Sequence, residues 1–375
     1  MPHLHPLPRG PKGNPMTIDR DIRDRIALLR FVMIFGVIVL HTPAYVPMTA
    51  LGTGWFDLTK AFFQLAVFRA TVPVLTVISG FLLFGAMLDR EPGRLWRKKG
   101  RTILIPFLFF NLALLPFALG AERFAGVKLS DALWPFDPAI WLNAAFGISD
   151  SPINYPLNFL RDLLVLILLA PLFGWMLRHM AWPGLVLVGV VFFSNYDGLL
   201  VRRDLMAVLF YAGGMVAVRG WNLRLLDRYA VACLIVFLAA CAAIVHFRIA
   251  NTTYLRIVAP FLIWPAASML IGSRAGTWLA RMSKYSFFMF LAHAPVLMVT
   301  SVLYKRFGEM LPYPVYWVLA PLVVTAILVA TYQVAMACMP RLFPTLIGAS
   351  GAARAGFAND AAPLAGPSRT APAEI

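Results

Sequence analysis

Residues 26–46 read IALLRFVMIFGVIVLHTPAYV, a stretch that is apolar for long enough to cross a lipid bilayer as a helix. A spanning helix needs about 20 mainly apolar residues. Nine further stretches of this kind follow along the chain, and the fifth span is the shortest. The sequence therefore predicts an all-α polytopic membrane protein with about ten transmembrane helices, at residues 26–46, 60–88, 102–120, 156–178, 182–196, 203–219, 229–247, 254–273, 284–304 and 314–338.

The composition of the whole chain indicates the same class. Of its 375 residues, 60% are hydrophobic and 13% are charged, and the mean hydropathy is +0.76. Soluble domains carry about 25% charged residues, so a water-soluble globule and a disordered chain are both excluded. The net charge of +16 fits basic loops that face anionic lipid, and no nucleic-acid partner is predicted. The three cysteines lie in apolar runs without metal-ligand spacing, so neither a metal site nor a disulfide is expected.

The distribution of Lys and Arg among the loops indicates the orientation. With the N-terminus in the cytoplasm, the inner segments hold 21 of these residues and the outer segments hold nine. The positive-inside rule therefore places both termini in the cytoplasm. Residues 1–22 and 346–375 are rich in Pro, Gly or Ala and are expected to be disordered tails around a membrane domain at 23–345.

Arg30 and His41 are ionisable residues within the first span. Such groups are costly in lipid and are functional candidates by default. Eleven residues separate them, which is three helical turns plus about 20°, so both lie on one face about 16 Å apart along the axis. Taken singly, Arg30 is compatible with a side chain that reaches the inner interface, and His41 with a hydrogen bond to a neighbouring helix. Their shared face favours a joint role.

Three more basic residues lie within later spans, namely Arg69, Arg161 and His293. Asp162 follows Arg161 directly, but neighbours on a helix point about 100° apart, so these two are not expected to pair. Acidic residues are nearly absent from the spans. The buried arginines are therefore expected to lack carboxylate partners, which favours an anionic ligand such as a phosphate-bearing cofactor.

The rise of a helix gives approximate depths for these basic groups. Measured from the cytoplasmic side, it places His41 and Arg161 at about 22 Å, Arg69 at about 17 Å and His293 at about 14 Å. Four helices thus bring basic groups to the middle and outer half of the membrane. Depth alone does not decide whether they share one cavity.

The longest outer loop is expected at about 121–155 and contains Trp134 and Trp141 beside several Asn and Asp residues. Tryptophans next to such polar side chains are suited to stack on a sugar and hydrogen-bond to it. They are equally suited to anchor the loop at the membrane surface. The sequence favours neither role over the other.

Five segments carry motifs in a fixed order. In RDRIALLRFVMIFGVIVLH at 23–41, ten residues separate Arg30 from His41. The other four segments are FRATVPVLTVISGFLLF at 68–84, KKGRTILIPFLFF at 98–110, PLNFLRDLLVLILLAPL at 156–172 and SKYSFFMFLAHAPVL at 283–297. Together with the span count, they resemble the acyltransferase 3 family of integral membrane O-acyltransferases. Asn158 stands where that family has an aromatic residue.

This resemblance implies a multi-pass enzyme of the bacterial inner membrane. Such enzymes move an acyl group, usually acetyl, from cytoplasmic acyl-CoA to a hydroxyl of a cell-surface glycan or lipid-linked sugar. The implied partners are acyl-CoA, this acceptor and the lipid bilayer, with no permanently bound cofactor and no metal. The resemblance also implies that Arg30 and His41 are the catalytic pair. The candidates for binding donor or acceptor are Arg69, Arg161, His293, Ser79, Tyr285, Trp134 and Trp141.

Several alternatives stay open at this level. His41 is suited either to act as general base on the acceptor hydroxyl or to carry the acyl group itself. Arg30 would orient the donor, and Arg69 or Arg161 would stabilise the oxyanion. A carrier or exporter of an anionic or glycan-related envelope substrate would use the same arginines without chemistry, and a non-catalytic membrane component is a third reading. The acceptor, the acyl group (acetyl or succinyl) and the oligomeric state are not decided.

Overall fold

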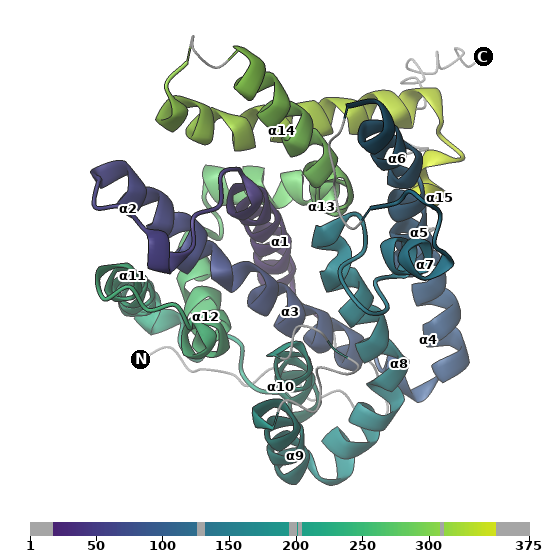
Figure 1. Cartoon of the computed structure of the whole chain (residues 1–375). Coiled ribbons are helices and arrows are strands. Elements are labelled where there is room, and N and C mark those ends of the chain that lie inside the picture. The colour runs from purple at the N-terminus through teal and green to yellow at the C-terminus, as the bar shows by residue number, and fades with distance from the viewer. Residues whose placement is uncertain (1–17, 126–131, 195–200, 202–204, 308–310, 350–375) are drawn as a thin grey trace, which may run out of the picture.

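The computed structural model describes residues 18–125, 132–194, 201, 205–307 and 311–349 (Figure 1). Within this part of the chain all regular structure is helical and no strand is present. The α-helices are α1 (Arg20–His41), α2 (Trp55–Ala61), α3 (Thr71–Gly85), α4 (Pro92–Lys99), α5 (Ile105–Leu112), α6 (Leu114–Ala125), α7 (Pro138–Phe146), α8 (Asn158–His179), α9 (Ala181–Phe193), α10 (Leu205–Arg219), α11 (Ala230–His246), α12 (Thr253–Ala266), α13 (Arg274–Phe307), α14 (Tyr313–Cys338) and α15 (Phe343–Leu346).

Seven helical stretches in the described residues are long and apolar enough to cross a membrane: Trp55–Gly85, Pro92–Phe124, Tyr155–His179, Asp227–His246, Thr253–Leu270, Arg274–Phe307 and Tyr313–Cys338. The short apolar helices α9 and α10 and the charged helix α1 coincide with the other three expected spans. The all-helical, multi-pass class is confirmed. The count of ten spans and the orientation stay predictions, and most of both expected tails lies outside the described residues.

Helix α1 lies at the centre of the helix array (Figure 1). It begins at Arg20 because the Asp19 side chain accepts a 2.9 Å hydrogen bond from the backbone N–H of Ile22, which caps the helix. Its most extensive packing is against α13, and it also packs against α3. The faces of α1 that pack on α13 and α3 are therefore covered by other helices.

Helices α3 and α10 approach each other closely at two glycines. A Cβ at Gly80 would overlap the backbone carbonyl of Phe210, and a Cβ at Gly213 would overlap the carbonyl of Val77. Small residues let membrane helices pack at short range. The close contact at Gly80 lies next to Ser79 in the sequence of α3.

The entry to α3 is irregular. A π-helical turn at Phe62–Ala66 and a 3₁₀ turn at Val67–Ala70 join α2 to α3. Such breaks in the regular hydrogen-bond ladder are frequent at functional sites. Arg69 lies within this break and not in a regular helix.

The segment expected as one outer loop at 121–155 is partly folded. Helix α6 continues to Ala125, and α7 begins at Pro138 where the Asp137 side chain accepts a 2.8 Å hydrogen bond from Ala139. A small apolar core joins α6 and α7 through Leu115, Leu133 and Ala144, among others. Apart from residues 126–131, which lie outside the described part, the loop is a packed layer.

Candidate functional site

Two histidines from helices far apart in the sequence meet in the interior. His41, at the end of α1, and His293, in the middle of α13, have a distance of 3.2 Å between Nδ1 of the first and Nε2 of the second. Their rings are nearly parallel, with centroids 5.4 Å apart and an interplanar angle of 22°. The structure thus brings together two of the residues that the sequence singled out.

The contact corrects the depths estimated from the sequence. These placed His293 about 8 Å closer to the cytoplasm than His41. Helix α13 begins at Arg274, ten residues before the expected span start at 284, so counting from that start underestimated the depth of His293. The two histidines lie at the same level.

The surroundings of His293 define which of its ring nitrogens carries hydrogen. The side chain is completely buried. Its Nδ1 lies 2.9 Å from the carbonyl oxygen of Phe290 and 3.2 Å from that of Met289. Both are acceptors only, so Nδ1 is the donor.

Tyr155 covers another side of His41. The two rings meet edge to face with centroids 5.0 Å apart. The preceding residue, Asn154, is buried and donates a 3.0 Å hydrogen bond to the carbonyl of Leu291 on α13. The segment before α8 is therefore tied to the same helix that presents His293.

Side chains from the turns between α2 and α3 hold the backbone that follows His41. Gln64 Nε2 donates a 2.7 Å hydrogen bond to the carbonyl of Thr42. Arg69 Nη2 donates a 2.8 Å hydrogen bond to the hydroxyl of Tyr45, and its guanidinium lies 5.7 Å from the Tyr45 ring centroid. The half-buried Arg69 thus lies on the same side of the fold as the end of α1.

The expectation that Arg161 does not pair with Asp162 is wrong. Arg161 Nη1 lies 2.9 Å from Asp162 Oδ1, and the Asp162 side chain is completely buried. The two Cβ atoms point apart, but the long arginine side chain folds back toward the carboxylate. A buried carboxylate without a counter-charge is costly, which explains this arrangement.

A cavity of about 550 Å³ opens beneath the histidine pair on the side of Arg30. Helices α1, α3, α8 and α13 and the end of α4 form its walls. Its polar and charged lining residues are Arg30, Ser79, Lys98, Lys99, Thr102, Ser283 and Ser286. No carboxylate lines it. The cavity therefore joins three cations in a site suited to an anion.

The polar groups of this inner cavity lack partners. Within the part of the chain that the structure describes, Arg30, Lys98 and Lys99 form no hydrogen bond or ion pair. The hydroxyl of Ser286 is buried and also has no hydrogen-bond partner there. Buried polar groups are normally satisfied, so the Ser286 hydroxyl indicates a place for a ligand, and the three cations without carboxylate partners beside it favour an anionic one.

Two phenylalanines lie between the inner cavity and the histidines. Phe159 and Phe290 both line the cavity, and their rings meet edge to face at 5.7 Å. The Phe290 ring is also 6.0 Å from that of His293. Phe290 therefore connects the lining of the cavity to the ring of His293.

The remaining candidates lie elsewhere. Ser79 lines the inner cavity and donates a 2.7 Å hydrogen bond to the carbonyl of Leu75. Tyr285 is buried against α14, where its hydroxyl accepts a 3.1 Å hydrogen bond from Gln333. Trp141 is half-buried and donates to the carbonyl of Leu133, whereas Trp134 is exposed. The structure does not bring these last three together with His41.

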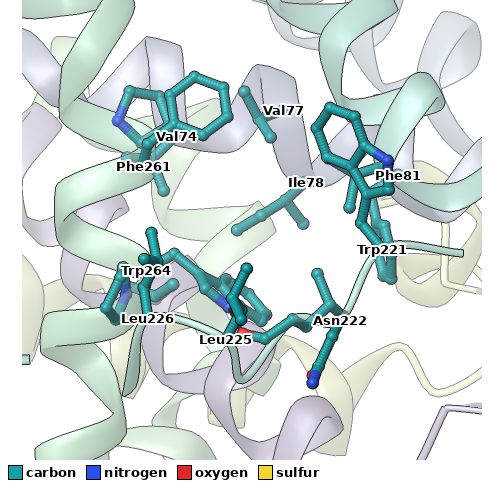
Figure 2. A pocket seen from close by; sticks show the side chains of 15 residues that line it. Val74, Val77, Ile78, Phe81, Trp221, Asn222, Leu225, Leu226, Phe261 and Trp264 are labelled. Atoms are coloured by element: carbon teal, nitrogen blue, oxygen red, sulfur yellow. Dashed lines mark hydrogen bonds between the residues drawn. The ribbon is translucent and has the colours of Figure 1, made fainter. Parts of the chain in front are cut away.

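A second cavity, of about 460 Å³, lies between α3, α12 and the segment at 221–226. Figure 2 shows its lining, which includes Val74, Ile78, Trp221 and Trp264, with the Asn222 amide pointing away from the open centre. None of its lining residues is charged. It is suited to hydrocarbon, whereas the inner cavity is suited to an anion.

Some residues of the site were not singled out by the sequence. Lys98 and Lys99 belong to a basic cluster that the positive-inside rule explains equally well. Ser286 and Phe290 lie seven and three residues before His293, so they share its helix face. That periodicity is the signal that would have found them.

Comparison with known proteins supplies a further line of evidence. A family model described as "Acyltransferase domain" matches residues 23–338. The succinoglycan biosynthesis protein ExoH of Rhizobium meliloti (strain 1021) is 30% identical, over 90% of this chain and 95% of that relative. No solved structure matches the chain significantly.

Proposed function

Because the chain belongs to the acyltransferase 3 family, we propose that it moves an acyl group from cytoplasmic acyl-CoA to a hydroxyl of a cell-surface glycan or lipid-linked sugar. The single observation that supports this donor is the inner cavity, in which Arg30, Lys98 and Lys99 gather without any carboxylate. Coenzyme A carries several phosphates, and unpaired cations in a partly enclosed site attract such anions strongly.

The proposed course of the donor follows from the wall of the cavity. The phosphates bind near Lys98 and Lys99, at the end of α4. The acyl thioester then extends past Arg30 and between Phe159 and Phe290 toward His41. Ser286 lies on this path, and its unpaired buried hydroxyl is suited to hydrogen-bond an amide or carbonyl of the pantetheine arm.

The proposed reaction at His41 is general base catalysis. His41 Nε2 takes the proton of the acceptor hydroxyl while the hydroxyl oxygen forms a bond to the acyl carbon. The carbon–sulfur bond then breaks, and His41 returns the proton to the departing thiolate. Attack by His41 itself, through an acyl-histidine intermediate, is the second course, and single-turnover trapping of acylated protein separates the two.

Of the two arginines considered for the oxyanion, Arg69 is the better proposal. Arg161 is already neutralised by Asp162, so its charge is less available to a developing negative charge. Arg69 donates its side-chain hydrogen bond to the neutral hydroxyl of Tyr45 and has no carboxylate partner among the described residues. A cation held in a site of low dielectric stabilises a tetrahedral intermediate effectively.

The proposed acceptor is a polysaccharide of the cell envelope. The relative is named for succinoglycan biosynthesis, and the exposed Trp134 offers a ring for sugar stacking. We propose acetyl as the acyl group and the bacterial inner membrane as the location, with both termini in the cytoplasm. Family membership favours this over a carrier that lacks chemistry.

The test uses the full chain in nanodiscs with radiolabelled acetyl-CoA or succinyl-CoA and envelope polysaccharide from a strain that lacks the gene. Transfer of label to the polysaccharide by wild-type protein, and its loss in His41→Ala, supports the proposal. Full transfer by a correctly inserted His41→Ala variant removes His41 from catalysis. If the protein releases label from neither acetyl-CoA nor succinyl-CoA, acyl-CoA is rejected as the donor.

A further inference from the structure

His293 is completely buried, and it is not among the residues that line the inner cavity. Its position therefore does not favour the expected role of binding donor or acceptor. Its hydrogen-bond and ring contacts among the described residues are with the His41 ring, the Phe290 ring and two backbone carbonyls of its own helix. A residue placed in this way acts on the chemistry through His41.

The hydrogen-bond pattern defines the tautomers of both rings. Nδ1 of His293 faces only carbonyl oxygens, so it carries a hydrogen. No carboxylate contacts this buried ring in the described residues, and burial without a counter-charge favours the neutral form. In the neutral ring, Nε2 of His293 then has a lone pair.

That lone pair decides the state of His41. Because His293 Nε2 accepts, His41 Nδ1 must donate across the 3.2 Å between them. A neutral His41 with hydrogen on Nδ1 has its own lone pair on Nε2, the nitrogen that takes a proton or attacks a carbonyl. The reverse tautomer would leave an N–H where the reaction requires a base.

We propose that His293 is a positioning residue that holds His41 in the tautomer with a basic Nε2. It takes the place that a buried carboxylate occupies in Ser-His-Asp sites, where the third residue orients the histidine. When His41 takes the acceptor proton, its Nδ1–H bond to His293 stabilises the resulting imidazolium. This inference rests on the proposed function, since it assigns His41 as the reacting group.

Two substitutions test the role. His293→Leu removes the hydrogen bond to His41 and those to the helix carbonyls. His293→Gln instead offers an amide oxygen to His41 and an amide N–H₂ to the helix carbonyls. We expect kcat to fall by a factor of about 10² to 10⁴ in His293→Leu, the range of general base catalysis. The KM for acyl-CoA should stay within about twofold, because His293 does not line the donor cavity. His293→Gln should recover most of kcat.

The proposal is overturned if His293→Leu keeps wild-type kcat, if it raises KM for acyl-CoA without lowering kcat, or if His293→Gln is as slow as His293→Leu. A measurement on unaltered protein covers the case in which His293→Leu does not fold. The chain has six histidines, so ¹⁵N-histidine labelling and solid-state NMR in bilayers can identify the His41 tautomer, with His41→Ala used for assignment. Hydrogen on Nδ1 supports the proposal, and hydrogen on Nε2 overturns it.

Failure of this inference is distinct from failure of the proposed function. If His41→Ala still transfers the acyl group, the assigned catalysis itself is wrong. If His41→Ala is inactive while both His293 variants behave as wild type, only the positioning role is wrong.

Discussion

Arg25 of α1 and Asp227, 202 positions later in the chain, form an ion pair with two hydrogen bonds of 2.8 and 2.7 Å. The Arg25 side chain is only 3% exposed, and its guanidinium lies 5.0 Å from the Trp264 ring centroid. The pair connects the start of α1 to the segment before α11. It therefore supports the position of the helix that carries Arg30 and His41.

Arg25→Ala should lower stability markedly. The change leaves the Asp227 carboxylate, which is 24% exposed, without its counter-charge, and breaking a buried pair in this way costs about 3 kcal/mol. Arg94→Ala is the matched control, because Arg94 and Glu91 are 70% and 60% exposed and such a surface pair contributes at most about 1 kcal/mol. Thermal unfolding in one detergent measures both. Equal midpoints for the two variants would contradict the prediction.

Substitutions at Lys98 and Lys99 should weaken donor binding. Each lysine lines the inner cavity without a partner in the described residues, and a hydrogen bond to a charged group contributes about 1.5 to 3 kcal/mol. Replacing either by Gln should raise the KM for acyl-CoA about tenfold, with little change in kcat. Steady-state kinetics at fixed ionic strength measures this effect.

Arg97→Gln is the control for the lysine variants. Arg97 belongs to α4 and carries the same charge, but it does not line the cavity. Its KM should stay near the wild-type value. If all three variants raise the KM for acyl-CoA equally, the rise comes from the lost surface charge in general and not from a donor site at the two lysines.

Arg30→Gln should reduce transfer more than either lysine variant does. Arg30 lies on the α1 stripe that faces α13, between the basic entrance and the histidines, and it has no partner in the described residues. Its loss removes one of the three cations among the described residues that line the inner cavity. We expect a fall of at least about tenfold in kcat/KM. If an Arg30→Gln variant that inserts normally keeps the wild-type kcat/KM, the Arg30 side chain reaches the inner membrane interface without contacting the donor.

Gly80→Ala should loosen the packing of α3 on α10. The added methyl group overlaps the Phe210 carbonyl, which is backbone and does not yield easily. Overpacking of this kind costs about 1 to 3 kcal/mol. Gly189→Ala, in the short apolar helix α9, meets open space and serves as control. A Gly80→Ala variant as stable as Gly189→Ala would contradict the close approach of the two backbones.

The helical class and most helix positions followed from local sequence, since apolar length is a property of neighbouring residues. The bounds were less accurate where a helix continues past the apolar run, as at the start of α13. The irregular entry to α3 was not predicted, because the turns at 62–70 show no break in hydropathy.

The chemistry of the site was predicted in part. Arg30 and His41 stand out because ionisable side chains are costly in an apolar helix. The pairing of Arg161 with Asp162 was missed, since rules for helix faces treat side chains as fixed directions and a long arginine bends. Lys98 and Lys99 could not be separated from other cytoplasmic cations by sequence alone.

The sequence by itself determined that the chain is a helical membrane protein, which ionisable residues interrupt its apolar stretches and which family it resembles. These depend on hydropathy and on motifs read along one chain. Only the tertiary structure decided that His293 contacts His41, that the inner cavity collects Arg30 with the two lysines, and that the Ser286 hydroxyl has no hydrogen-bond partner among the described residues. Those relations join helices far apart in the sequence, and packing between helices, which no single helix encodes, brings them together.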